Sequence, residues 1–433
     1  MVLIYHKGMS AREELLDRIE ADREELIKFL QTFVQAPSPN PPGNTVAAAE
    51  VISKFLSKHG LKSETVAPKD DLPNIVSIVQ GASTAGPRLV MNGHIDVFPV
   101  TDGNDWDHGP WSGDIVNGRI YGRGVVDMKA GTAATVAAFA YVASRREELR
   151  GTLVLQAVSD EETGGRWGSR YLLEQDERKD LWRGDCVLNS EPSGLQSIRF
   201  GEKGTLRMTF TVRTPGAHGA YLHLSEGAIR VAARLITRLL VIEQIDDFEL
   251  DPALRSYLKR DKVRHTIDEI MGEGAGANII RPTVNIGVIR GGSKVNMIPS
   301  LCEFETDIRL PIGLTAEAIL ARIDGILGDF PEASYSVQKA ASNPPNSCAP
   351  DHPLGRAIAD SAEDVLNRRP VAIPSMGATD CKFWRYLGVP AYSFGLSPDG
   401  MASKNESVSL DDYISLVKVH ALAALDYMTN KRG

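Results

Sequence analysis

The stretch Met91-Asn92-Gly93-His94-Ile95-Asp96-Val97 decides the fold. It continues Arg88-Leu89-Val90-Met91, a short apolar run typical of a buried strand, so His94 and Asp96 stand at a strand end. Residues two apart in an extended segment point to the same face. A neutral imidazole is the commonest metal ligand, and a nearby carboxylate can fix its tautomer and direction. A lone His-x-Asp pair is usually an ordinary polar pair, so other motifs must support a metal site.

Around this stretch, expected strands alternate with expected helices. Strands are predicted at 75–79, 88–91 and 153–158, and helices at 45–59 and 132–144. Before them, a capping box at Ser10 to Glu13 and apolar residues from 15 to 33 predict one amphipathic helix. The alternation predicts an α/β fold with a mixed, largely parallel sheet covered by helices. Such sheets hold their sites at the carboxyl ends of strands.

The pattern changes after about residue 200. Apolar and polar residues alternate from 206 to 213, and the elements then follow the order β-α-β-β-α-β as far as about 337, typical of a ferredoxin-like α+β domain. Residues 243–278 look like a charged insertion within it. The α/β style returns with a helix near 354–366, a strand near 390–394 and a helix at 410–427. We therefore expect a discontinuous catalytic domain of residues 1–200 and 340–433, with an inserted domain of residues 201–339.

Composition excludes several classes of partner. The 433 residues carry a formal net charge of −8 without a basic tract, which argues against nucleic acid. We find no apolar run of membrane-spanning length and no signal-peptide pattern in residues 1–10. The four cysteines are far apart and read as reduced thiols. A cytoplasmic protein without a membrane partner is expected.

Three further acidic segments follow predicted strands or precede a helix. Asp127 stands in Gly122-Arg123-Gly124-Val125-Val126-Asp127-Met128-Lys129, Glu161 and Glu162 in Ser159-Asp160-Glu161-Glu162-Thr163-Gly164-Gly165, and Glu191 in Asn189-Ser190-Glu191-Pro192. Each alone also suits a helix cap or a solvated loop. Together with His94 they form a joint signal, because carboxylates at strand ends are costly without a cation or hydrogen bonds. Nitrogen and oxygen ligands of this kind suit zinc, manganese or cobalt.

The set of motifs resembles the metallopeptidase family of aminoacylases, acetylornithine deacetylases, succinyl-diaminopimelate desuccinylases and glutamate carboxypeptidases. The matching segments occur in the family's order, and the resemblance covers nearly the whole chain, including the inserted domain. It implies that His94, Asp127 and Glu191 ligate a first metal, with Asp127 as the bridging ligand and Glu162 belonging to a second metal. Asp96 would orient His94. Glu161 would be the general base that takes a proton from water and delivers it to the leaving nitrogen.

The resemblance also assigns residues in the inserted domain, which in this family is a lid and dimerisation domain. His218, in Ala217-His218-Gly219, resembles a histidine that reaches the partner subunit's active site and stabilises the oxyanion, so a homodimer is implied. Asn296 and Arg309 resemble substrate-binding positions. Arginine suits a substrate carboxylate. From the residues alone, His218 could be a simple turn histidine, and Arg309 could only pair with an acidic neighbour.

One position departs from the family pattern. A metal-binding histidine usually stands three residues before an Asn-Glu pair, but here Ala402 precedes Asn405-Glu406, and Ser403 is the alternative alignment. His420, on the last predicted helix, reads as a packing or surface residue. We therefore expect one tightly bound ion and a second position that is empty or loosely filled. Lys382 also stands where the family commonly has arginine.

The main expectation is a metal-dependent hydrolase that cleaves an amide C–N bond in a small, carboxylate-bearing substrate. The second possibility is a mononuclear aminohydrolase that removes ammonia from an aromatic amine such as an aminobenzoate. The third is a binding protein without activity, which retention of Glu161 disfavours.

Overall fold

The computed structural model describes residues 9–101 and 105–429, which form two compact units. The first unit contains the described parts of Met1–Phe200 and Thr379–Gly433, together with Cys348–Ile373. The second contains Gly201–Ser347 and Pro374–Ala378. Most of the N-terminal segment in which no signal peptide was expected lies outside the described residues.

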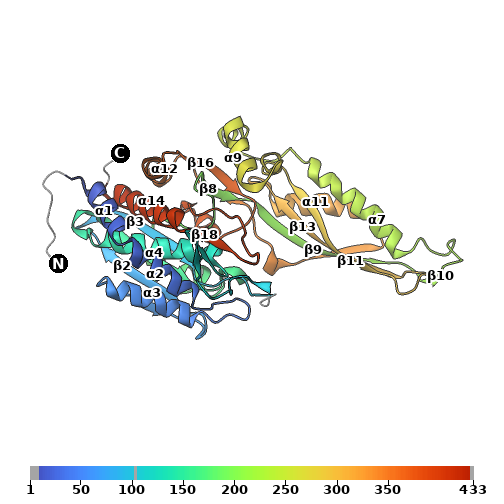
Figure 1. Cartoon of the computed structure of the whole chain (residues 1–433). Coiled ribbons are helices and arrows are strands. Elements are labelled where there is room, and N and C mark those ends of the chain that lie inside the picture. The colour runs from blue at the N-terminus through green and yellow to red at the C-terminus, as the bar shows by residue number, and fades with distance from the viewer. Residues whose placement is uncertain (1–8, 102–104, 430–433) are drawn as a thin grey trace. The chain divides into compact units, whose positions relative to one another are not determined.

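A mixed sheet forms the centre of the first unit (Figure 1). In spatial order its strands are β1 (Glu64–Val66), β2 (Asn74–Gln80), β6 (Arg150–Val158), β3 (Ser83–His94), β7 (Cys186–Asn189), β17 (Ala391–Ser393) and β8 (Ser197–Glu202). The four central strands, β6, β3, β7 and β17, pair in parallel. The flanking pairs β1–β2, β2–β6 and β17–β8 are antiparallel. The predicted helix-covered α/β fold is confirmed.

Helices cover both faces of this sheet. On one face, α4 (Ala130–Ala143) and α14 (Leu410–Thr429) contact β3 and β6 and pack on each other. On the other face, α5 (Ser169–Glu174), α6 (Lys179–Arg183) and α13 (Cys381–Tyr386) supply buried side chains to a cluster with the strands. The remaining helices of this unit are α1 (Ala11–Ala21), α2 (Arg23–Val34), α3 (Val46–Lys58) and α12 (Pro353–Leu366).

The first helix differs from its prediction. The expected single helix over residues 15–33 is two helices, α1 and α2, that meet at Asp22. Asp22 leaves helical geometry, and its carboxylate accepts a hydrogen bond from Tyr141 Oη at 3.0 Å. Aspartate is a weak helix former that prefers such contacts. The predicted capping box is present, since Ser10 and Glu13 each bond to the other's backbone.

A small antiparallel sheet contacts the turn Val125–Lys129, which precedes α4. It consists of β4 (Ile115–Val116), β5 (Arg119–Tyr121) and β18 (Ser407–Ser409), in the order β18-β5-β4. The sequence analysis missed these strands because they are only two or three residues long. Their pairing fixes the register between the segment before Asp127 and the segment after Glu406.

The second unit has the predicted ferredoxin-like topology. Its elements are β9 (Gly204–Arg213), α7 (Ala228–Leu239), β11 (Thr283–Gly291), β13 (Leu301–Leu310), α11 (Ala316–Leu327) and β14 (Ala333–Val337). The strands form an antiparallel sheet in the order β11-β13-β9-β14. The two helices share a buried core with the sheet. A short pair of strands, β10 (Ala217–His218) and β12 (Met297–Ile298), extends from it.

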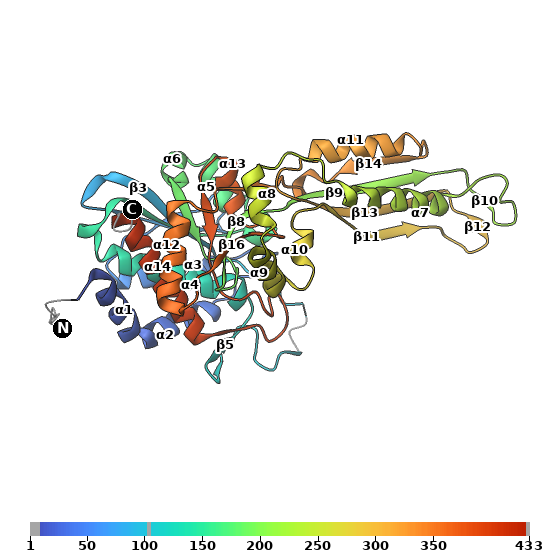
Figure 2. The same ribbon diagram turned by 90° about the horizontal axis from the view of Figure 1, so that it is seen from above.

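The charged insertion of the second unit is helical. It contains α8 (Pro252–Leu258), α9 (Asp261–Met271) and α10 (Ala275–Asn278), which lie together in Figure 2. The buried Lys203 ammonium donates to the carbonyl oxygens of Asn278 and Arg281 at 2.8 and 2.7 Å. The remaining strands of the described residues are β15 (Asn346–Ser347) and β16 (Val371–Ser375).

One stretch, Val125–Ala143, is long and apolar enough to cross a membrane, although the sequence analysis expected none. Its apolar window is 94% buried inside the protein, as expected for the core helix of a globular unit. Across the described residues, the four cysteines form no disulfide.

Candidate metal centre

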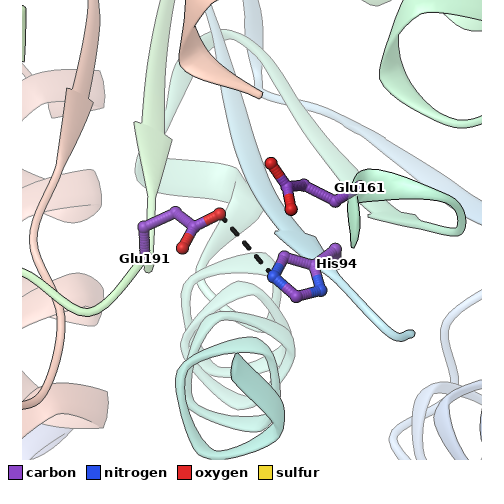
Figure 3. Close-up of side chains that lie close together, drawn as sticks. All are labelled: His94, Glu161 and Glu191. Carbon is purple, nitrogen blue, oxygen red and sulfur yellow. Dashed lines mark ion pairs between the residues drawn. The ribbon is translucent and has the colours of Figure 1, made fainter. Parts of the chain in front are cut away.

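The parallel centre of the sheet brings the acidic segments together. His94 is the last residue of β3 and pairs in register with Val158 at the end of β6, while Asn92 pairs with Asn189 at the end of β7. The loop after β6 carries Glu161 and Glu162, and the loop after β7 carries Glu191. Figure 3 shows His94, Glu161 and Glu191 converging from these three strand ends.

The site is compact and sheltered from solvent. His94 Nε2 lies 3.1 Å from Asp127 Oδ1. It lies 3.6 Å from Glu191 Oε1, the contact dashed in Figure 3. Ligand atoms of His94, Glu161 and Glu191 lie within 4.8 Å of one another, as do those of His94, Asp127 and Glu162. His94, Asp127 and Glu191 are buried. The structure thus brings together the metal-ligand candidates from four separate segments.

Asp96 fixes the orientation of the His94 ring. His94 Nδ1 lies 2.9 Å from the Asp96 carbonyl oxygen and 3.5 Å from Asp96 Oδ1. Because a carbonyl oxygen only accepts, Nδ1 carries a proton, and Nε2, which faces Asp127 and Glu191, is the nitrogen that would lose its proton to ligate an ion. The Asp96 carboxylate also accepts from the backbone N–H groups of Glu161 and Glu162, each at 3.2 Å.

The pKa values of this cluster are shifted because several carboxyl groups are buried close together. Burial, reinforced by neighbouring carboxylates, raises the pKa of Glu161 to about 8 and that of Glu162 to about 11. Burial likewise raises the pKa of Glu191. Although burial alone would lower it, hydrogen bonds with Asp127 and Asp96 raise the pKa of His94 well above its ordinary value.

The donor set fits a divalent transition metal. In the described residues, the buried Glu162 Oε1 has no hydrogen-bond partner. An orphaned acceptor among crowded carboxylates is what a bound cation would satisfy. One imidazole and several carboxylates suit zinc, manganese or cobalt.

Comparison with known proteins identifies the family. Residues 90–426 match the model of the Peptidase family M20/M25/M40. The chain belongs to this family. It is 28% identical over 406 residues to a succinyl-diaminopimelate desuccinylase of Methylorubrum extorquens, a match that covers 91% of this chain and 96% of the relative. The M20 family is metal-dependent, so the chain is a metal-dependent hydrolase.

Two solved structures show the same fold. The M20 family metallo-carboxypeptidase Sso-CP2 from Sulfolobus solfataricus aligns with a TM-score of 0.74 at 21% identity, over 97% of this chain and 99% of its own. The di-peptidase Dug1p from Saccharomyces cerevisiae aligns with a TM-score of 0.71 at 17% identity, over 98% of this chain and 99% of its own. The family resemblance inferred from the motifs is confirmed.

Two further residues that the sequence analysis missed make contacts around the site, Asn40 and Asp160. Asn40 Nδ2 lies 2.9 Å from Asp96 Oδ2 and 3.2 Å from Asp160 Oδ1, so it links the loops after β3 and β6. Asp160 has φ +74° and accepts from Trp167 N at 2.9 Å, which shapes the loop just before Glu161. A proline-rich stretch gave no signal for Asn40, because its contacts are made only in the folded chain.

Two more buried charges belong to the same region. Asp380 Oδ2 accepts from Ser169 Oγ at 2.7 Å, while its Oδ1 has no hydrogen-bond partner within the described residues. Lys382, where the family commonly has arginine, donates to the Thr379 carbonyl oxygen at 3.1 Å. Its positive charge opposes the effect of burial on the pKa of both Asp380 and Glu161.

Ala402, at the position where the family usually has its last metal-binding histidine, has no side-chain atom that can ligate a metal. Ala402 is exposed and has φ +58°. His420 is buried within α14, where its Nε2 donates to the Phe394 carbonyl oxygen at 2.7 Å and burial lowers its pKa to about 4. His420 therefore has a packing role, which is one of the two alternatives that the sequence analysis gave for it.

The three residues predicted in the inserted domain lie in the second unit. His218 is exposed on β10, and its Nδ1 accepts from Ala220 N at 3.2 Å. Gly219 N donates to the Asn296 carbonyl oxygen at 2.7 Å, so His218 and Asn296 stand on neighbouring segments. Arg309 is paired with Asp307 through Nε and Nη2, at 2.8 and 3.0 Å.

Proposed function

We propose that this protein cleaves the amide C–N bond of a small, carboxylate-bearing substrate, in the manner of a deacylase or desuccinylase. The convergence of Glu161 with His94, Asp127 and Glu191 carries the proposal. The match to a succinyl-diaminopimelate desuccinylase over most of both chains supports an N-acyl substrate rather than a peptide.

His94, Asp127 and Glu191 would hold one divalent ion, with Asp127 also facing Glu162. When bound, the ion supplies Lewis acidity, which polarises the scissile carbonyl and acidifies water. Glu161 is the general base: it accepts a proton from the attacking water and delivers it to the leaving nitrogen. Asp96 keeps the His94 Nε2 lone pair toward the ion.

We further propose one tightly held ion per chain, either zinc, manganese or cobalt. With Ala402 in place of a histidine, a second ion would keep only Asp127 and Glu162 as protein ligands. Two carboxylates and water hold a transition metal weakly, because imidazole contributes much of the affinity of such sites.

In the second unit, Arg309 and Asn296 are proposed to bind the substrate, with Arg309 recognising its carboxylate. The pairing of Arg309 with Asp307 holds the guanidinium in one orientation. His218 is proposed to act in the partner subunit's active site, which requires a homodimer. Exposed apolar side chains near β10 and β12 suit such an association: Tyr221, Leu222, Leu224, Val295 and Met297.

The disulfide-free cysteines are consistent with a cytoplasmic location, which is also part of the proposal. No role for nucleic acid or a membrane is proposed.

A second candidate function is hydrolytic deamination of an aromatic amine such as an aminobenzoate. The unusual position Ala402 favours it, since an atypical metal site would suit atypical chemistry. A binding protein without activity is the remaining alternative, and the retained Glu161 argues against it.

The deciding experiment is a substrate screen on protein loaded with zinc, manganese or cobalt. N-succinyl and N-acyl amino acids are compared with aminobenzoates, and Glu161→Gln protein is the control. Release of a carboxylate and an amine supports deacylation. Ammonia release without a carboxylate co-product would instead support deamination, and ligand binding without turnover would support the binding protein.

A further inference from the structure

The carboxylate of Glu406 is buried against the turn that carries Asp127. Glu406 is 1% exposed. Its Oε1 accepts from the backbone N–H groups of Val126 and Asp127 at 2.8 and 3.3 Å. Its Oε2 accepts from Gly124 N at 3.0 Å and from Arg123 Nη1 at 2.9 Å. One side chain thus collects four donors from five consecutive residues.

The small sheet delivers Glu406 to this position. Ser407 pairs with Tyr121, and the next contact along the two segments is Gly122 N donating to the Glu406 carbonyl oxygen at 3.0 Å. Glu406 therefore stands where the β18–β5 ladder ends and the turn begins. The backbone bond sets its register, and the carboxylate then reaches along the turn.

Within the turn, Val125 N donates to the Gly122 carbonyl oxygen at 3.3 Å and Lys129 N to that of Gly124 at 2.7 Å, but neither bond involves Asp127. Residues Val125–Lys129 depart from regular helical geometry before α4 begins. Gly124 has φ +73°, and a Cβ there would lie 2.0 Å from Val97 Cγ1, so the turn passes tightly against the segment after His94. On its far side, Lys129 Nζ donates to the carbonyl oxygens of Phe33 and Ala36. Between these anchors, the backbone N–H of Asp127 bonds to Glu406.

We infer that Glu406 is a positioning residue for the metal centre: through three backbone N–H groups it holds the Asp127 carboxylate beside His94 Nε2, so that both could ligate one ion. The inference rests on the proposed metal site. In this chain, Asn405-Glu406 lacks the histidine that usually accompanies it. Glu406 nevertheless supports the His94–Asp127–Glu191 site.

A carboxylate is needed because every group facing it is a donor. A glutamine amide has the same size, but its NH2 group would face an N–H whichever way the amide turned. The buried donors left unpaired would favour a shift of the turn, and Asp127 would move with it. Partners that orient metal ligands in this way typically contribute roughly 10- to 100-fold in metal affinity.

The test is a Co²⁺ titration of the metal-free full-length chain. Visible absorption reports the coordination geometry, and competition with a chelating dye reports the dissociation constant. Glu406→Gln is expected to bind Co²⁺ roughly 10- to 100-fold more weakly, with a changed spectrum. Arg123→Gln removes the same ion pair but leaves the three backbone bonds, so its loss of affinity is expected to be clearly smaller.

Asp426→Asn is the matched control, since Asp426 is another buried carboxylate of the same unit, paired with Arg12. It is expected to lower the unfolding temperature of the metal-free protein while leaving Co²⁺ affinity and spectrum unchanged. Equal losses of affinity in Glu406→Gln and Asp426→Asn would overturn the inference, because they would reflect general destabilisation.

Folded Glu406→Gln protein with the parental affinity and spectrum would also overturn it. If Glu406→Gln does not fold, Glu406→Asp replaces it: the charge is kept but withdrawn by one methylene, and weaker Co²⁺ binding supports the inference while parental binding refutes it. Parental protein that binds no Co²⁺ would refute the proposed metal site itself, a result distinct from any of these.

Discussion

The backbone N–H of Glu161 donates to Oδ1 of Asp96 at 3.2 Å. The same carboxylate lies 3.5 Å from His94 Nδ1. Asp96 therefore connects the proposed general base with a proposed metal ligand, although the two come from the loops after β6 and at the end of β3. A change at Asp96 should disturb metal binding and proton transfer together, whereas a change at Glu161 should disturb proton transfer alone.

Replacing Glu161 by glutamine should abolish turnover and leave metal bound. General bases contribute typically 10²- to 10⁴-fold to a rate, so we expect a loss on the order of 10³-fold in kcat. Steady-state kinetics and elemental analysis of the same sample check both parts. Substantial remaining activity would mean that another group is the base.

Replacing Asp96 by asparagine should weaken the site more broadly. The new NH2 group would face N–H donors of Glu161, Glu162 or Asn40, all of which now donate to the carboxylate. We expect roughly a 10- to 100-fold loss of metal affinity together with a fall in kcat. Isothermal titration with zinc measures the first. Unchanged affinity would show that the Asp96 carbonyl oxygen, which the substitution keeps, is enough to orient His94.

The pH dependence of the metal-free protein should reveal the crowded carboxylates. The folded-state pKa of Glu161 is raised to about 8, so the folded protein holds a proton that the unfolded chain has released above its ordinary pKa of 4.5. Stability from this proton is full below pH 4.5 and is lost as the pH rises toward 8. Thermal unfolding between pH 5 and pH 8 should therefore show a falling midpoint, with a shallower slope in Glu161→Gln.

Bound metal should abolish this fall of the unfolding midpoint with pH. A bound cation favours the ionised carboxylates, so the metal-loaded protein should keep its midpoint over the same pH range. Identical pH slopes with and without metal would contradict the assignment of these carboxylates to a metal site.

Much of this architecture could be predicted from the sequence, for reasons that particular residues illustrate. Apolar runs such as Leu153 to Val158 identify buried strands, and parallel strands end at one edge, so His94, Glu161 and Glu191 could be expected to meet. Asn40 and Glu406 could not be found in this way. Their contacts depend on how loops pack against one another, which no periodicity encodes. The break at Asp22 escaped for a similar reason, since it involves Tyr141 from a distant helix.

Replacing Ala402 by histidine should raise the number of tightly bound ions from about one to about two per chain. The residue has φ +58°, a conformation that histidine tolerates better than most residues, so the change should fold. Elemental mass spectrometry after metal loading and desalting measures the ratio. Ala402→Asn, also tolerant of this conformation but a poor transition-metal ligand, is the control. Two ions already present in the parental protein would mean that another residue supplies the missing ligand.

Mixing two inactive variants should test the proposed role of His218 across subunits. His218→Ala and Glu161→Gln chains should each be nearly inactive as homodimers. If His218 serves the partner's site, a mixed dimer has one site with both residues intact. Random exchange makes about half of the dimers mixed, so about a quarter of the parental activity should return. The control mixes Glu161→Gln with Asp96→Asn. Both residues belong to the same chain's active site, so every site in a mixed dimer keeps one defect. This mixture should therefore recover less activity than the first. No recovery in the first mixture, with subunit exchange verified by native mass spectrometry, would place His218 outside the partner's active site.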